Sequence, residues 1–158
     1  MKKRILVPLD GSKLGEAALG AVEKYLVPDS KENVEVVLLG VVTSLSHWVV
    51  SGEGGIEAVP AGPIPYTEDE LNVIRKSVNK YLNSVAVKLK RKGISASTEV
   101  RTGHADREIL NAVEALNIDI IAMSTHGRSG LSHLAFGSVA EKVLRQATVP
   151  VLTVRAKG

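Results

Sequence analysis

One segment in the last third of the chain has the residue types that bind phosphate. Residues 124–138 read Ser-Thr-His-Gly-Arg-Ser-Gly-Leu-Ser-His-Leu-Ala-Phe-Gly-Ser. Glycines in such a segment let backbone amides approach an anion without a Cβ in the way, and there are three of them: Gly127, Gly130 and Gly137. Hydroxyl groups and a guanidinium could add further donors, from Thr125, Ser129, Ser138 and Arg128. Taken alone, the same glycines would also suit a tight loop with no ligand.

An acidic residue, Asp10, follows the first apolar run of the chain. Its carboxylate could accept hydrogen bonds from ribose hydroxyls or from an adenine edge, or it could cap the helix that follows. Gly11 and Ser12 fit a turn and a cap better than ligand contacts. Val41 could offer its backbone and an apolar surface to a base, or it could be a plain core valine.

Several kinds of chemistry lack the residues they need. The chain has no cysteine, and its four histidines form no cluster with metal-ligand spacing, so we assign no metal site. His126 and His133 could touch phosphate, although histidines in loops are commonly solvated or structural. There is no Gly-x-Ser-x-Gly motif and no Walker-type lysine, so we assign no catalytic residue. Slow ATP hydrolysis is the most that we expect.

Composition narrows the class of protein. Twenty Lys and Arg against 17 Asp and Glu give a net charge of +3, which is too small an excess to indicate a nucleic-acid partner. No apolar stretch approaches the ~20 residues that cross a membrane. The apolar run near the N-terminus ends at Asp10, too soon for a signal peptide. We therefore expect a cytoplasmic protein that contacts neither nucleic acid nor membrane.

Apolar runs and amphipathic segments alternate along the whole chain. The runs predict five strands, at Arg4–Leu9, Val34–Val42, Ser95–Arg101, Ile118–Met123 and Val149–Val154. Apolar residues at helical spacing predict helices over Leu14–Tyr25, from Thr67 to about Gly93, over Asp106–Leu116 and over Ser138–Gln146. Residues from about 43 to 66 are rich in Gly and Pro and predict a long flexible loop, and 124–136 predict another loop.

The long helix carries the clearest boundary signals. Thr67 and Glu70 have the spacing of a capping box, and Gly93 suits the position just after the helix. We expect its inward face to comprise Leu71, Ile74, Val78, Leu82, Val85 and Leu89.

Alternating strands and helices predict an α/β fold with one open, five-stranded parallel sheet and helices on both faces. The third strand is weakly apolar and belongs at an edge, which favours the order 3-2-1-4-5. The chain then reverses its winding direction between the first and fourth strands. Ligands of open α/β sheets bind at such a switch point, at the carboxyl ends of the strands. This rule selects residues 8–12 and 124–138.

Three stretches together resemble the universal stress protein family. They are residues 5–12 (Ile-Leu-Val-Pro-Leu-Asp-Gly-Ser), residues 124–127 with Gly137-Ser138, and residues 149–152 (Val-Pro-Val-Leu). ATP-binding members carry Gly, two residues, Gly, nine residues, then Gly and Ser or Thr. Here Gly127, the spacer 128–136 and Gly137-Ser138 match this pattern, while Ser124 replaces the first glycine. The resemblance covers essentially the whole chain and implies one domain over residues 1–158 with the Rossmann-like fold of adenine nucleotide alpha hydrolases.

The resemblance also implies a function and a set of contacts. It implies a stress-response or signalling protein that binds ATP or AMP, with Mg²⁺ or Mn²⁺ bridging to the phosphates. The alternatives are a nucleotide-free interaction module of the same fold and a weak ATPase. Family members pair their last strands, which suggests a homodimer through Val149–Val154; the signalling partner is not specified. The candidate nucleotide-contacting residues are Pro8, Asp10, Val41, Met123, Ser124, His126, Gly127, Arg128, Ser129, Gly130, Gly137, Ser138 and Val139.

Overall fold

A computed structural model describes residues 2–27, 31–43, 66–126 and 137–156 of the chain. Its sheet has five parallel strands in the order β3-β2-β1-β4-β5, as the sequence predicts. The strands are β1 (Lys3–Pro8), β2 (Val34–Val42), β3 (Ser95–Thr102), β4 (Ile120–His126) and β5 (Val151–Ala156). The helices are α1 (Ala17–Ala21), the π-helical turn Val22–Leu26, the 3₁₀ turn Lys31–Asn33, α2 (Glu68–Arg91), α3 (Ala105–Ala115) and α4 (Ser138–Gln146).

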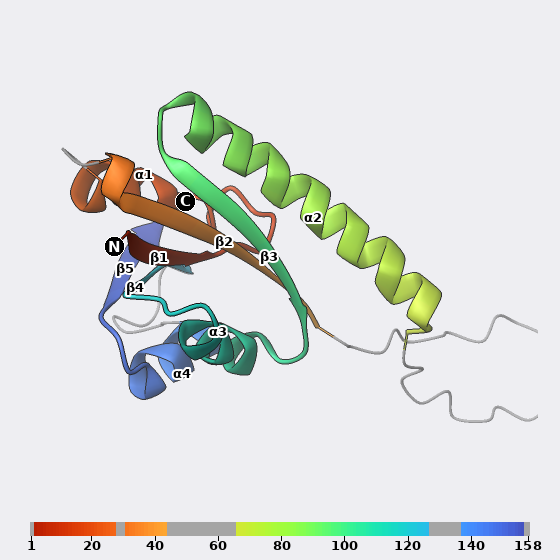
Figure 1. The fold of residues 1–158 in the computed structure, drawn as a ribbon. Helices are drawn as coiled ribbons and strands as arrows, with labels where there is room; N and C mark the ends of the chain where they lie inside the picture. The colour runs from red at the N-terminus through yellow and green to blue at the C-terminus, as the bar shows by residue number, and fades with distance from the viewer. Residues whose placement is uncertain (1, 28–30, 44–65, 127–136, 157–158) are drawn as a thin grey trace, which may run out of the picture.

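Two layers of helices cover the two faces of the sheet (Figure 1). The long helix α2 and the short α1 lie on one face, and α3 with α4 lies on the other. Side chains of β1 alternate between the faces: Ile5 and Val7 belong to the core under α1 and α2, and Leu6 belongs to the core under α3 and α4. This alternation is why the first strand reads as a continuous apolar run.

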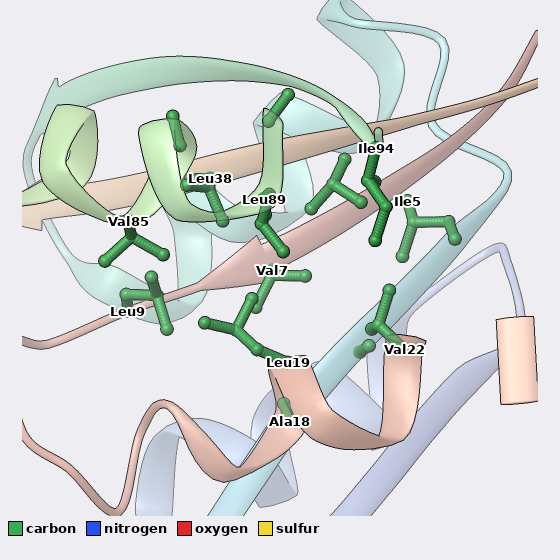
Figure 2. Close-up of a cluster of buried hydrophobic side chains, with 14 of the residues drawn as sticks. Ile5, Val7, Leu9, Ala18, Leu19, Val22, Leu38, Val85, Leu89 and Ile94 are labelled. Carbon is green, nitrogen blue, oxygen red and sulfur yellow. The ribbon is translucent and has the colours of Figure 1, made fainter. Parts of the chain in front are cut away.

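The core on the α1–α2 face contains side chains from the first helical segment, from β1 and from α2. Figure 2 shows Leu19 and Val22 of the first helical segment meeting Val7 of β1 and Leu89 of α2. All four are at most 8% exposed. Their packing fixes where α1 begins over the sheet, and so fixes the turn that connects it to β1.

The boundaries of α2 confirm the signals in its sequence. Thr67 accepts a hydrogen bond from the Glu70 amide, and the Glu70 carboxylate accepts one from the Thr67 amide at 2.7 Å, which completes the capping box. Gly93 follows the helix at φ +79°, a conformation that favours glycine. Leu82, Val85 and Leu89 of the expected inward face are buried, while the other three, nearer the start of the helix, are half-buried: Leu71, Ile74 and Val78.

The structure corrects several of the sequence-based boundaries, including the start of β4, which lies at Ile120 rather than Ile118. The first helix starts at Ala17 and passes into a π-helical turn, and Tyr25, expected inward, is 62% exposed. Strand β4 continues through His126, although 124–126 were expected to begin a loop, because β5 pairs with it as far as His126↔Ala156. Strand β5 starts at Val151 rather than Val149. The expected loop over 43–66 falls outside the described residues except for its two end residues.

Candidate functional site at the carboxyl ends of β1 and β4

Strands β1 and β4 are direct neighbours in the sheet, although about 115 residues separate them in the chain. They pair in parallel with Ile5 opposite Ile120 and Leu6 opposite Ile121. The next helix after β1 is α1, on one face of the sheet, and the next helix after β4 is α4, on the other face (Figure 1). The predicted switch point is therefore present between these two strand ends.

The turn after β1 is built around the carboxylate of Asp10. Its Oδ1 accepts hydrogen bonds from the Ser12 amide at 2.9 Å and from the Ser12 hydroxyl at 2.6 Å. The Ser12 hydroxyl in turn accepts the Gly15 amide at 2.9 Å, and Gly11 lies at φ +85°. Asp10 thus shapes the turn while its side chain remains at the surface. Gly11 and Ser12 form part of the turn, as expected, but the expected capping role is wrong, because the N-cap residue of α1 is Glu16.

Gly15 allows this turn to close tightly. A Cβ at Gly15 would lie 2.6 Å from the Asp10 Oδ1 atom and 3.3 Å from the Ser12 hydroxyl. A Cβ at Gly15 would therefore push the Asp10 carboxylate out of its position, so glycine lets the backbone pack closely on that carboxylate. Sequence reasoning did not single out Gly15; a glycine five residues after the acid is the signal that was available.

Ser124 joins the end of β4 to the start of α1. Its hydroxyl accepts the Ala18 amide at 2.9 Å and donates to the Gly15 carbonyl at 3.0 Å. The α1 helix has no capping side chain of its own, because Glu16 at the N-cap position makes no such bond. The hydroxyl of Ser124 is therefore occupied by protein groups, and its backbone is the part that remains for a ligand.

The N-terminus of α4 opens without a capping side chain. Gly137 occupies the N-cap position and makes no side-chain bond to the helix, and Ser138 begins the helix at the surface. Gly137 lies at φ −57°, where any residue fits, and a Cβ there would meet nothing within 4 Å. Neither backbone geometry nor packing within the described residues requires glycine at this position. The first amides of a helix and its partial positive charge suit an anion.

Packing and one ion pair hold α4 in place. Ala140 and Val143 are buried in the core on the α3–α4 face, and Val139 packs against that core. Lys142 pairs with Asp106 of α3 at 3.4 Å. Burial acts to raise the pKa of Asp106, but the hydrogen bond and charge of Lys142, together with backbone amides, hold that pKa below its ordinary value. Both contacts orient the start of α4 relative to α3.

Val41 lies near the end of β2, beyond the last residue of β1. The register pairs Pro8 with Leu39, and the Leu9 amide donates to the Leu39 carbonyl at 2.8 Å. Backbone groups of a parallel strand alternate sides, so the N–H and C=O of Val41 face the same side as those of Leu39. They therefore point past the end of β1, toward the space above the switch point. Its side chain packs against the core on the α3–α4 face.

The structure describes only some of the remaining candidate residues. Met123 is 5% exposed and belongs to the core, so only its backbone reaches the strand end, whereas Pro8 is half-buried at the end of β1. The central part of the expected phosphate segment lies outside the described residues: Gly127, Arg128, Ser129 and Gly130. Of His126, the structure describes the backbone, as the last residue of β4.

Tyr81 and Glu16 belong to this region but were missed by sequence reasoning. The Tyr81 hydroxyl of α2 donates to Glu16 Oε1 at 2.9 Å, immediately beside Gly15. Burial, the hydrogen bond to Glu16, and the charges of Glu16 and Asp10 all raise the pKa of Tyr81 above its ordinary value. The available signal was a tyrosine at an inward helical position, because a buried tyrosine hydroxyl needs a partner.

The site therefore combines an exposed carboxylate, the amides of an open helix N-terminus and the backbone of a strand end. These groups can bind hydroxyls, an anion and a heterocyclic base, respectively. Within the described residues, no three side chains of the metal-ligating types gather around a common point. None of the helices in that part of the chain is long and apolar enough to span a membrane.

Comparisons with known proteins agree on one family. The model of the universal stress protein family matches residues 1–155. Universal stress protein YxiE of Bacillus subtilis is 31% identical over 158 residues, covering 98% of this chain and 100% of that protein. Universal stress protein MJ0577 of Methanocaldococcus jannaschii is 26% identical, covering 100% of this chain and 98% of its own length.

Solved structures show the same fold. The structure of MJ0577 matches with a TM-score of 0.69 at 25% identity, covering 100% of this chain and 99% of that one. A universal stress protein family protein from Arabidopsis thaliana, solved with AMP bound, matches with a TM-score of 0.64 at 18% identity, covering 99% and 93% of the two chains.

Proposed function

Because the chain belongs to the universal stress protein family, we propose that it is a stress-response or signalling protein that binds an adenine nucleotide, ATP or AMP, at the ends of β1 and β4. The observation that carries the proposal is the open N-terminus of α4. Among the described residues, neither the φ angle of Gly137 nor any neighbour requires glycine there, and its lack of a side chain leaves the space in front of the helix amides clear of a Cβ. A phosphate group approaching those amides is a physical reason for such a glycine.

The other groups of the site match the other parts of the nucleotide. Phosphates would lie against Gly137 and Ser138, with the ribose near the Asp10 carboxylate and the base beside the backbone of Val41. A carboxylate accepts two ribose hydroxyls, and a strand backbone offers one donor and one acceptor to an adenine edge. Mg²⁺ or Mn²⁺ would arrive with the phosphates, since divalent ions of this kind bind through phosphate oxygens and water.

A relative supports the choice of ligand class. The Arabidopsis thaliana family member was solved with AMP bound, and it shares the fold of this chain at a TM-score of 0.64. Mass spectrometry of the bound ligand distinguishes ATP from AMP.

The test is to identify and then titrate the ligand. Mass spectrometry of the supernatant from acid-denatured protein should detect ATP or AMP, and calorimetry on stripped protein should show binding of one of them. Gly137→Glu should abolish binding, because it places a negative side chain where the phosphate would be. Gly20→Glu is the matched control, because Gly20 is also exposed with nothing within 4 Å of its Cβ position, but lies in α1. Equal binding by the two variants would refute the proposed site.

We also propose that two copies associate through β5. This strand forms one edge of the sheet, and Val151, Leu152 and Val154 are only half-buried there. An edge strand with apolar side chains invites pairing with another strand. Sedimentation velocity should give a dimer for the wild type and a monomer for Val154→Lys; a monomeric wild type would overturn the proposal.

A further inference from the structure

The Ser124 hydroxyl caps a helix that is distant in sequence. Ala18 is fully buried in the first turn of α1, and its amide needs a partner because no residue before α1 supplies a capping side chain. Ser124 supplies it from β4, 106 residues further along the chain. The same hydroxyl donates its single proton to the Gly15 carbonyl. That proton is then not available to a phosphate oxygen.

A continuous path of hydrogen bonds leads from Ser124 to the Asp10 carboxylate. Ser124 holds the Gly15 carbonyl, and the Gly15 amide donates to the Ser12 hydroxyl. The Ser12 hydroxyl donates to Asp10 Oδ1 at 2.6 Å. Gly15 also packs directly on Oδ1. Each bond along this path restricts the next, so the position of Asp10 depends on where the end of β4 lies.

We propose that Ser124 is a positioning residue of the nucleotide site. Its hydroxyl fixes the Asp10 turn against the end of β4, and thereby sets the spacing between the carboxylate and the backbone at the end of that strand. The effect of Ser124 on nucleotide binding rests on the proposed function. The hydrogen bonds that connect Ser124 to the Asp10 turn exist without nucleotide. It also gives a physical purpose to a serine at the position where the ATP-binding pattern has its first glycine.

The first measurement needs no ligand. Amide hydrogen exchange followed by NMR should show Ala18 protected in the wild type and about tenfold less protected in Ser124→Ala, the factor expected when a hydrogen bond of ordinary net strength is lost. The Ser12 and Gly15 amide resonances should shift in the same variant. Ser124→Thr keeps the hydroxyl and should retain both signatures. Ser124→Cys keeps a side chain of similar volume, but its thiol forms only weak hydrogen bonds. It should therefore behave like Ser124→Ala, and it replaces that variant if the alanine protein folds poorly.

The second measurement is nucleotide affinity by calorimetry. Ser124→Ala should weaken binding of ATP or AMP about tenfold, and Ser124→Thr should restore it. Ser97→Ala is the matched control, because the Ser97 hydroxyl also has a part-buried partner, Glu35 at 2.8 Å, but lies on the edge strand β3. That control should leave the affinity and the Ala18 protection at wild-type values.

The outcomes separate the two proposals. If the wild-type protein binds neither nucleotide, the proposed function is refuted. The NMR measurements on the Ser12, Gly15 and Ala18 amides would still test whether Ser124 positions the turn. Unchanged Ala18 protection in both Ser124→Ala and Ser124→Cys would overturn the helix-capping role. Two results for Ser124→Ala would overturn the positioning role. The first is a loss of Ala18 protection while the Ser12 and Gly15 resonances do not shift. The second is a loss of Ala18 protection with unchanged nucleotide affinity, where the wild type binds nucleotide.

Discussion

The hydroxyl of Tyr81 donates a hydrogen bond to the carboxylate of Glu16, with 2.9 Å between the two oxygens. Tyr81 lies in the middle of α2, and Glu16 is the N-cap residue of α1. The bond therefore connects the two helices that cover the same face of the sheet (Figure 1). Glu16 follows Gly15 directly, so this contact also supports the turn that carries Asp10.

We predict that Tyr81→Phe lowers the free energy of unfolding at neutral pH by about 1 kcal/mol, the typical net contribution of one hydrogen bond. The pKa of Tyr81 is higher in the folded than in the unfolded protein, so the stabilisation is complete below about pH 10, the pKa of an unperturbed tyrosine. Above that pH the unfolded chain loses the proton first, and the stabilisation declines. Urea unfolding from pH 8 to 11.5 should show the difference between wild type and variant shrinking above about pH 10.

Tyr25→Phe is the matched control for this experiment, because Tyr25 is 62% exposed. Its unfolding free energy at pH 8 should stay within about 0.5 kcal/mol of the wild type. A difference between wild type and Tyr81→Phe that does not change with pH would contradict the prediction.

We predict that Gly40→Ala destabilises the protein by about 1–3 kcal/mol, the usual cost of overpacking a core. A Cβ at Gly40 of β2 would overlap Val78 Cγ1 and lie 3.2 Å from Leu82 Cδ1, so these side chains or α2 itself would have to shift. Adding Val78→Ala to Gly40→Ala should recover part of the loss. Urea unfolding checks this, with Gly20→Ala as a control that should stabilise α1 by up to about 1 kcal/mol. Strict additivity of the Gly40 and Val78 substitutions would argue against the contact.

We predict that two substitutions at Asp10 separate its structural role from ligand binding. Asp10→Asn keeps an oxygen that can accept the two Ser12 hydrogen bonds, so stability should change by less than about 0.5 kcal/mol, while Asp10→Ala should lose about 1 kcal/mol. Both should weaken nucleotide binding about tenfold or more, since each removes a charged acceptor. Calorimetry and urea unfolding measure the two effects. Wild-type affinity in Asp10→Asn would mean that the carboxylate serves the turn alone.

We predict that Gly137→Ser changes stability and binding in opposite directions. Gly137 has the extended backbone of an N-cap residue, and serine there can accept an amide hydrogen bond, so α4 should gain a few tenths of a kcal/mol or more. The same side chain would enter the space assigned to phosphate and reduce nucleotide affinity. Melting temperature and calorimetric affinity report the two effects. A variant that gains both stability and affinity would contradict the assignment of this space.

The sequence predicts the strand order well because the strands differ in how many polar residues they contain. The polar, alternating residues of β3 indicated an edge strand, and the order that follows from this is the order found. The end of β4 was harder to predict. Ser124 and Thr125 are polar and read as a loop, but β5 supplies backbone partners opposite them, and Thr125 is buried at 6% exposure. Pairing with a strand near the end of the chain overrides local polarity there.

The sequence names candidate site residues one by one, but it does not predict the contacts among them. Asp10 and Gly137 are candidates because of their places at the switch point and in the family pattern. The shortened first helix was missed because helical spacing of Leu14 and Ala17 does not show that the preceding residues close a turn on Asp10. Likewise, the bond between Ser124 and Ala18 joins residues 106 apart, and no local pattern reports such a pair.

The central strand β1 and its neighbour β4 lie more than 100 residues apart in sequence, at Lys3–Pro8 and Ile120–His126. During synthesis, β1 can pair with β2 and be covered by α2 early, but its other edge stays unpaired until β4 has left the ribosome. Contacts between such distant segments form late and slow the folding of a chain. The switch point between β1 and β4 is therefore completed only after β4 has been synthesised, and chains truncated before β4 should lack the proposed nucleotide site.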